Sequence, residues 1–366
     1  MSAELPDLLT NSGTNTLTGT VLAIQANYYQ VRLDLESLSS FSPPPPSPTL
    51  LCTRRTRLKK IGQRVMVGDR VEVEEPDWAG GRGAISQVFP RKAELDRPPV
   101  ANANQILLVF ALAEPDLDPY QLSRFLVKAE STALRVCLCL NKSDLLTDTE
   151  QNQWLNRLQE WGYCPFLISV KTRVGLDALL TQLRDRITVV SGPSGVGKSS
   201  LINWLIPQAN LRVGAVSGKL ARGRHTTRHV ELFELPQGGL LADTPGFNQP
   251  ELDCAPEELA AYFPEAQQRL AVADCQFSDC LHRDEPNCAV RGEWERYAHY
   301  LNFLEEAIAR QGKLNRTADE ESSLKLKTKS HGRQSYEPKL EPKKYRRPSR
   351  RTQQQELQGL TEEFEE

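Results

Sequence analysis

Residues 192–199 have the types and the GxxxxGK[ST] spacing that hold the phosphates of a nucleotide. A β-branched run, 187–190, precedes them and a helix-like run from Ser200 follows, which is the strand-loop-helix context of a phosphate loop. Glycines let backbone N–H groups point inward, Lys198 adds charge near the β- and γ-phosphates, and Ser199 offers a hydroxyl to Mg²⁺. The predicted phosphate-binding residues are Gly192, Pro193, Ser194, Gly195, Val196, Gly197, Lys198, Ser199 and Ser200.

A second polar group, Asn141, Lys142, Ser143 and Asp144, has the pattern of an NKxD turn that recognises guanine. It follows the apolar run 133–140, so we expect it at the carboxyl end of a strand. The carboxylate of Asp144 can accept from guanine N1–H and N2–H₂, a donor pair that adenine lacks, and a buried acceptor left unpaired is costly. Lys142 would pack along the base, and Asn141 would tie the turn to the phosphate loop.

The order of these segments carries information of its own. Ser169, Val170 and Lys171 resemble a turn whose backbone N–H reaches guanine O6, and they lie about one βα unit after the NKxD turn. Both base-recognition segments precede the phosphate loop, whereas in an ordinary GTPase the phosphate loop opens the domain. The order therefore predicts a GTPase whose ends have been cut and rejoined.

Further nucleotide contacts are expected after the phosphate loop. Residues 239–246 read as a buried strand that ends in DxxG, where Asp243 can reach Mg²⁺ through water and the Gly246 N–H can sense the γ-phosphate. In the polar segment before it, either Thr226 or Thr227 could complete the Mg²⁺ shell when GTP is bound, and the sequence does not choose between them. Segments ordered by the γ-phosphate are the usual switches of such proteins.

A cluster of soft ligands lies nearer the C-terminus: Cys275, Cys280, His282 and Cys288 fall within fourteen residues. Three thiolates and one imidazole suit a closed tetrahedral zinc site with a structural role. A disulfide interpretation is disfavoured because the sequence has no secretory signal and a nucleotide-driven enzyme belongs in a reducing compartment. The other five cysteines are scattered and are interpreted as structural.

Taken together, the motifs NKSD, ISVKT, GPSGVGKSS, GRGRHTT, DTPGF and CxxxxCxHxxEPxC resemble those of the RsgA (YjeQ, EngC) family of circularly permuted GTPases, which act in small ribosomal subunit maturation. The resemblance runs from about residue 16 to residue 310 and rests on the combination and order of the motifs. It implies an N-terminal OB-fold β-barrel, a central permuted P-loop GTPase α/β domain and a C-terminal zinc-binding, mostly helical domain. It also places a histidine in the switch segment, which makes His225 the candidate that positions the attacking water; a solvated loop side chain is the alternative.

The pattern of residues 16–95 agrees with a barrel of short strands. Tyr29, Val31, Leu33 and Leu35 alternate with polar residues, as in half-buried strands. Residues 42–48 are rich in proline and read as an exposed insertion. A cationic run suited to RNA phosphates follows it, with a solvated loop as the alternative: Arg54, Arg55, Arg57, Lys59, Lys60 and Arg64.

The expected organisation is a flexible start (1–15), an OB-fold (16–95), the permuted GTPase domain (96–250), the zinc-binding domain (251–311) and a basic, disordered tail (312–366). Residues 105–112 are apolar without alternation, as in a central parallel strand. An amphipathic helix is predicted after the cysteines, with its apolar face formed by Trp294, Tyr297, Leu301, Leu304 and Ile308.

Composition limits location and partners. The 366 residues carry 45 Lys and Arg against 47 Asp and Glu, and no apolar run reaches membrane-spanning length. We expect a cytoplasmic monomer with no membrane partner, one structural Zn²⁺, and Mg²⁺ bound with GTP. The basic tail either contacts rRNA or only solvates the chain.

Two functions of different classes follow. The favoured one is a GTP hydrolase stimulated by the small ribosomal subunit, which binds rRNA and acts in late maturation of that subunit. The alternative is a guanine-nucleotide-regulated RNA-binding module in which hydrolysis is incidental, because Phe247 stands where many GTPases carry a glutamine. An ATPase is a poorer interpretation, since Asp144 does not match adenine.

Overall fold

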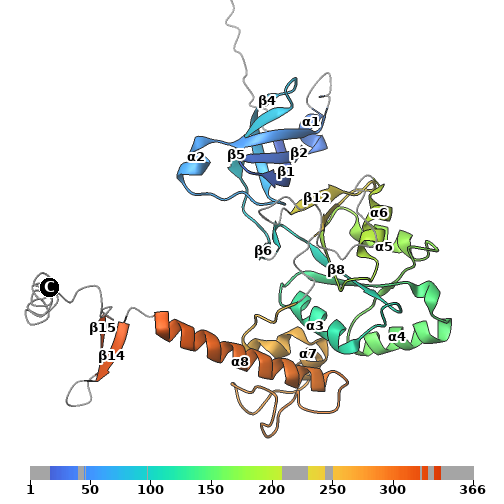
Figure 1. Ribbon diagram of the computed structural model, residues 1–366, viewed down its shortest axis with the longest axis vertical. Coiled ribbons are helices and arrows are strands. Elements are labelled where there is room, and N and C mark those ends of the chain that lie inside the picture. The colour runs from blue at the N-terminus through green and yellow to red at the C-terminus, as the bar shows by residue number, and fades with distance from the viewer. Residues whose placement is uncertain are drawn as a thin grey trace, which may run out of the picture. The chain divides into compact units, whose positions relative to one another are not determined.

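The computed structural model describes residues 17–39, 45, 47–96, 98–207, 230–243, 250–321, 324–328 and 334–338. Near the N-terminus it contains a closed five-stranded barrel (Figure 1). The strands are β1 (Leu17–Gln25), β2 (Tyr28–Leu33), β3 (Thr49–Arg54), β4 (Arg70–Asp77) and β5 (Arg82–Val88). Because β1 pairs with both β2 and β4, no strand edge of the barrel is left open. The expected OB-type barrel is confirmed.

The end of β2 differs from the sequence expectation. Tyr29, Val31 and Leu33 are buried as the alternation predicts, but Leu35 is 78% exposed and begins helix α1 (Leu35–Leu38). The reason is Asp34, whose carboxylate accepts from Thr18 Oγ1 and from Arg70 and so holds the chain at the strand end. A second short helix, α2 (Thr56–Lys60), lies between β3 and β4.

The central domain is a doubly wound α/β sheet with strand order β10-β9-β8-β11-β13-β12. Its strands are β8 (Gln105–Ala111), β9 (Arg135–Asn141), β10 (Phe166–Leu167), β11 (Ile187–Ser191), β12 (Glu231–Glu234) and β13 (Leu240–Asp243). All neighbours are parallel except β12 and β13. Every residue of β8 is buried, which confirms that it is a central strand covered on both faces.

Two apolar layers cover the two faces of this sheet. Helices α3 (Pro119–Glu130) and α4 (Asp148–Glu160) pack one core through residues such as Phe125 and Leu158. Helices α5 (Leu176–Leu183) and α6 (Lys198–Leu205) pack the other through residues such as Leu179 and Leu201. All the parallel strands therefore end at one edge of a covered sheet, which is where α/β folds place ligands.

The barrel joins this sheet at two places. Strand β1 pairs with β12 at Ala23 and Glu231. Beside it, the hairpin of β6 (Glu94–Asp96) and β7 (Pro99–Ala101) meets Gly68, which has φ +87° and lies so close that a Cβ would sit 2.0 Å from the Ala101 carbonyl oxygen. Val67 and Val100 enter the core of the central domain here.

The cysteine-rich region, residues 251–304, packs a core of its own against α3. Its regular elements are the 3₁₀ helix η3 (Pro256–Tyr262), α7 (Pro264–Leu270) and the start of α8 (Tyr297–Glu321). The buried face of α8 consists of Tyr300, Phe303 and Leu304, packed with Phe263. Most of the predicted apolar face is confirmed, because Leu304 is buried and Trp294, Tyr297 and Leu301 pack partly buried against this core, whereas Ile308 is 37% exposed.

A second unit of the chain begins at Glu305. Within it, β14 (Leu324–Thr328) pairs antiparallel with β15 (Gln334–Pro338). Both strands lie in the basic segment 312–366, for which the sequence predicts disorder. Composition alone does not reveal that they pair. Among the described residues, no helix is long and apolar enough to cross a membrane.

Candidate nucleotide site and metal centre

The phosphate loop lies between β11 and α6, as the sequence predicts. Gly197 caps α6 with φ +95°, and a Cβ there would lie 2.4 Å from Nδ2 of Asn141. Gly192 has φ +142°, and a Cβ there would lie 2.1 Å from the Val109 carbonyl oxygen. Both positions require glycine, because backbone conformation and space exclude a side chain. Lys198 is the first residue of α6, and its Nζ donates to the Gly192 carbonyl oxygen at 2.8 Å.

Asn141 joins the three predicted nucleotide-binding segments. It is the last residue of β9 and is 2% exposed. Its Nδ2 donates to the Val196 carbonyl oxygen of the phosphate loop at 2.9 Å, and its Oδ1 accepts from the Val170 N–H at 3.3 Å. The two base-recognition segments and the phosphate loop are therefore held together by one buried amide. The sequence predicts its tie to the phosphate loop, but not its bond to Val170.

Asp144 is held from the side of the second base-recognition segment. Its Oδ1 accepts from the Ser169 hydroxyl at 2.6 Å, and Ser169, which is fully buried, in turn accepts from the Thr172 N–H at 3.0 Å. The Lys171 Nζ lies 4.0 Å from the other carboxylate oxygen. A carboxylate fixed in this way presents its acceptors in a defined direction, as discrimination between bases requires.

Lys142 lies against the phosphate loop. Its backbone is left-handed, with φ +61°, and its Nζ donates to the Gly195 carbonyl oxygen at 3.1 Å and to the Glu114 carbonyl oxygen. The stem of this side chain therefore runs between the base-recognition turn and the loop. The contact with Glu114 was not expected, because an exposed glutamate that contributes only its carbonyl oxygen has no sequence signature.

Gln151, on α4, is a second residue that sequence reasoning missed. Its Nε2 donates to the carbonyl oxygens of Ser143 at 2.9 Å and of Leu146 at 3.1 Å. The 3₁₀ turn η1 (Ser143–Leu145), which contains Asp144, is thus fastened to the first turns of α4. A lone glutamine belongs to no motif, so only its position seven residues after the NKxD segment hints at this contact.

The remaining predicted nucleotide residues are only partly described. Asp243 ends β13, where it pairs with Val190 at the carboxyl edge of the sheet, beside the start of the phosphate loop. His225, Thr226, Thr227, Gly246 and Phe247 lie outside the described residues. Ser199 and Ser200 occupy the first turn of α6, as expected.

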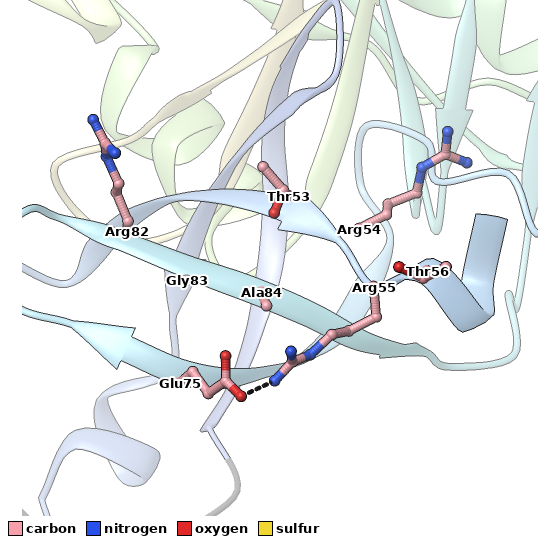
Figure 2. Close-up of a pocket in the computed structure, with 8 residues that line it drawn as sticks. All are labelled: Thr53, Arg54, Arg55, Thr56, Glu75, Arg82, Gly83 and Ala84. Carbon is pink, nitrogen blue, oxygen red and sulfur yellow. Dashed lines mark ion pairs between the residues drawn. The ribbon is translucent and has the colours of Figure 1, made fainter.

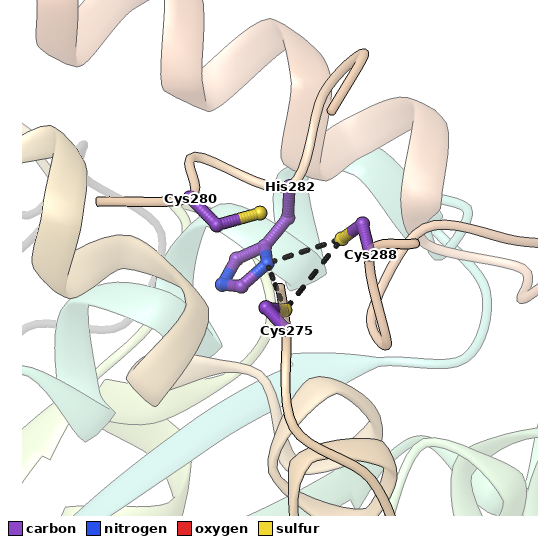
Figure 3. A group of neighbouring side chains, drawn as sticks. All are labelled: Cys275, Cys280, His282 and Cys288. Carbon is purple, nitrogen blue, oxygen red and sulfur yellow. Dashed lines mark hydrogen bonds between the residues drawn. The ribbon is translucent and has the colours of Figure 1, made fainter. Parts of the chain in front are cut away.

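The four predicted metal ligands converge (Figure 3). The ligand atoms of Cys275, Cys280, His282 and Cys288 all lie within 4.8 Å of one another. The His282 Nδ1 is 3.5 Å from the Cys275 sulfur and 3.3 Å from the Cys288 sulfur, and these two sulfurs are 3.9 Å apart. Sulfurs at about 2.3 Å from a tetrahedral ion would be about 3.8 Å apart. The donor set and its spacing therefore fit a metal ion.

The loop around these ligands is held by a carboxylate and two phenols. The Glu285 side chain accepts from the N–H groups of Leu281 at 2.9 Å, Arg283 at 2.8 Å and Asp284 at 3.1 Å. The hydroxyls of Tyr297 and Tyr300 donate to the carbonyl oxygens of His282 and Leu281. His282, with φ +59°, is thus fixed with its ring nitrogen toward the sulfurs.

Burial changes the proton affinity of the ligands. It lowers the pKa of His282, which favours the neutral imidazole that binds a metal. Burial, together with the neighbouring thiols, raises the pKa of the Cys280 thiol to about 12. A metal ion must therefore displace a proton from this cysteine when it binds.

A polar groove with a volume of about 360 Å³ lies on the barrel (Figure 2). Its lining residues are Thr53, Arg54, Arg55, Thr56, Glu75, Arg82, Gly83 and Ala84. Arg55 is ion-paired with Glu75 and with Glu74, and Arg82 is exposed on the neighbouring strand β5. The rest of the predicted cationic run, at 57, 59, 60 and 64, is also exposed.

Comparison with known proteins adds four findings. Residues 88–253 match the family model described as RsgA GTPase. A "small ribosomal subunit biogenesis GTPase RsgA" from Trichormus variabilis is 67% identical over 365 residues, covering 96% of this chain and 99% of the relative. The crystal structure of YjeQ from Thermotoga maritima has 31% identity and a TM-score of 0.67, covering 81% of this chain and 99% of that one. The structure of YloQ, described as a circularly permuted GTPase, has 30% identity and a TM-score of 0.66, covering 82% and 98%.

Proposed function

Because this chain belongs to the RsgA GTPase family and is a GTP hydrolase, we propose that it acts in late maturation of the small ribosomal subunit. The subunit and its rRNA would be its partners and would stimulate its turnover. The names of the curated relatives support this proposal, since they describe small ribosomal subunit biogenesis GTPases. A role in maturation of the small ribosomal subunit would place the chain in the cytoplasm.

The observation that carries the proposed site is the position of Asn141. Its amide bonds both to the phosphate loop, at Val196, and to the second base-recognition segment, at Val170. A guanine nucleotide bound there would lie with its phosphates at residues 192–200 and its base between Lys142 and Asp144. Guanine would donate N1–H and N2–H₂ to Asp144, and the N–H groups near Val170 would face O6.

The chemistry would depend on charge placed around the γ-phosphate. Lys198 and the inward N–H groups of the loop would stabilise negative charge on the phosphoryl oxygens while water attacks in line. Ser199 would hold Mg²⁺ directly and Asp243 through water, with Thr226 or Thr227 completing the shell. His225 is our candidate for positioning the water, and Gly246 for sensing the γ-phosphate.

We assign zinc to the cluster of Cys275, Cys280, His282 and Cys288. Three soft thiolates with one imidazole favour this ion, and four protein ligands leave no open position, so the role would be structural. The barrel groove would contact rRNA phosphates, because its arginines provide planar donors for phosphate oxygens.

The alternative is a guanine-nucleotide-regulated RNA-binding module in which hydrolysis is incidental. Measurement of GTP and ATP turnover by the full chain, with and without small ribosomal subunits and at two salt concentrations, separates the two. We expect GTP-selective turnover that the subunit stimulates, with weaker stimulation at the higher salt concentration, since phosphate contacts release counterions.

Two results would contradict this proposal. Equal turnover of ATP and GTP would contradict the role of Asp144 in selecting guanine over adenine. Tight, GTP-dependent subunit binding without stimulated turnover would instead support the binding module. The role of Asp144 is tested directly with an Asp144→Asn variant. This substitution keeps the shape of the turn but removes an acceptor for guanine.

A further inference from the structure

We propose that Glu295, in the cysteine-rich region, is a positioning residue for guanine recognition. It would act through helix α4, so that this region and the base site are energetically coupled. The inference rests on the guanine site proposed above and adds a residue about 150 positions away in sequence from Asp144. Three sets of contacts connect Glu295 with Asp144: one at each end of α4 and one in the segment that follows this helix.

The first set fastens the N-terminal end of α4 to the base-recognition turn. The Gln151 amide donates to the carbonyl oxygens of Ser143 and Leu146, on either side of Asp144 and Leu145. Thr147 caps the helix in a capping box with Glu150. The turn that carries Asp144 therefore has to follow any displacement of this helix end.

The second set fastens the C-terminal end of α4 to Glu295. One carboxylate oxygen accepts from Arg157 Nε at 2.5 Å, and the other accepts from Trp161 Nε1 at 2.6 Å. Trp161 is only 1% exposed, so its indole N–H has a partner that burial makes hard to replace with water. A single carboxylate from another region thus holds both residues in a fixed orientation.

The third set continues toward the other base-recognition segment. Gly162 packs so closely against Pro264 that a Cβ would lie 2.8 Å from the proline Cβ. The Arg296 guanidinium lies 4.8 Å from the ring centroid of Trp161 and 5.6 Å from that of Tyr163. Six residues after Tyr163 the chain reaches Ser169, whose hydroxyl donates to Asp144.

The turn that contains Asp144 is therefore anchored on α4 through Gln151, and the segment that contains Ser169 follows the end of α4 along the chain. Helices transmit displacements as rigid elements, so a change at Glu295 reaches Asp144 by two routes, through Gln151 and through Ser169. By linkage, a ligand of the cysteine-rich region that changes guanine affinity by some factor has its own affinity changed by guanine by the same factor.

The test uses the full metal-bound chain and compares binding of GDP with binding of inosine diphosphate. Inosine lacks the 2-amino group. The dissociation constant for inosine diphosphate divided by that for GDP therefore measures how well Asp144 is aligned with guanine. We expect Glu295→Ala to reduce this ratio about fivefold, and to leave metal content unchanged. Glu293→Ala is the matched control, because it removes an exposed carboxylate two residues away and should keep the wild-type ratio.

Gln151→Ala should reduce the same ratio, and Gln151→Ala combined with Glu295→Ala should reduce it by less than the product of the single effects, since both act on one turn. A purely structural role for Glu295 would lower the melting temperature or weaken both nucleotides equally, and either result with an unchanged ratio overturns the proposal. If the wild-type chain does not distinguish the two nucleotides, the guanine site itself is wrong.

Discussion

At the scale of single residues, the cysteine-rich region contains a buried ion pair of Arg296 and Glu265, and the Arg296 guanidinium lies beside Trp161 of the central domain. Arg296 is fully buried, and its Nε donates to Glu265 Oε1 at 2.7 Å while Nη2 donates to the other oxygen. The guanidinium also lies over the rings of Trp161 and Phe263, at 4.8 Å from each centroid. Such a charge is stable only while both partners are present.

We predict that Arg296→Met lowers the free energy of unfolding by about 3–5 kcal/mol, because it leaves the Glu265 carboxylate buried without a partner. Denaturant unfolding followed by tryptophan fluorescence measures this, since Trp161 adjoins the pair. The double variant Arg296→Met with Glu265→Met should recover most of the loss. A single variant as stable as wild type would show that the pair contributes little.

At the scale of the element, the loop around the metal ligands depends on Glu285, which accepts from three backbone N–H groups. We predict that Glu285→Ala lowers metal affinity about 10–100-fold, because residues that orient ligands have effects of this size. Competition with a chromophoric chelator measures the affinity. Asp284→Ala, which removes the adjacent exposed carboxylate, is the control and should bind metal as wild type does.

The same measurement has a predicted pH dependence. Because burial raises the Cys280 thiol pKa to about 12, this group is protonated at neutral pH before metal binds, and binding must release the proton. Metal affinity should therefore rise with pH through the neutral range. An affinity that does not change between pH 6 and pH 8, both well below that value, would contradict metal binding by the thiolate.

At the scale of the whole molecule, Gly68 decides how closely the barrel meets the β6–β7 hairpin. Gly68→Ala would place a Cβ 2.0 Å from the Ala101 carbonyl oxygen, whereas Gly62→Ala, at a similar φ of +69°, has nothing within 4 Å. Both variants carry the strain of a left-handed alanine, but only the first also clashes. We predict that Gly68→Ala is less stable than Gly62→Ala by about 1–3 kcal/mol.

Thermal unfolding of both variants measures this difference, and limited proteolysis locates it. The Gly68→Ala chain should be cleaved faster near residues 102–104, between the hairpin and β8, while Gly62→Ala should keep the wild-type pattern. Equal stability and equal cleavage of the two variants would show that the barrel joins the central domain by other contacts, such as the ion pair of Arg32 with Glu234 at 3.3 Å.

The kind of fold could be predicted from the sequence alone, and so could the candidate site residues. Phosphate loops, base-recognition turns and metal-binding loops consist of short segments whose residue types are fixed by the group they bind, so Lys198, Asp144 and His282 could be identified from local spacing. Strands could be predicted from hydrophobic patterns, as for the continuous apolar run of β8 and the alternation of Tyr29, Val31 and Leu33, and these residues are buried. The end of β2 at Leu33 was missed, because the bonds that Asp34 makes with Thr18 and Arg70 are not local.

The residues that support the candidate site could be identified only in the folded chain. Gln151 and Glu295 belong to no motif, and their roles depend on which carbonyl or indole group the fold brings to them. The same holds for Tyr300 and Phe303 of α8, which the predicted apolar face did not include and which are buried by packing against Phe263. Motifs consist of residues that contact a ligand and lie close together in sequence. Supporting contacts join segments far apart in sequence, so they can be identified only in the folded chain.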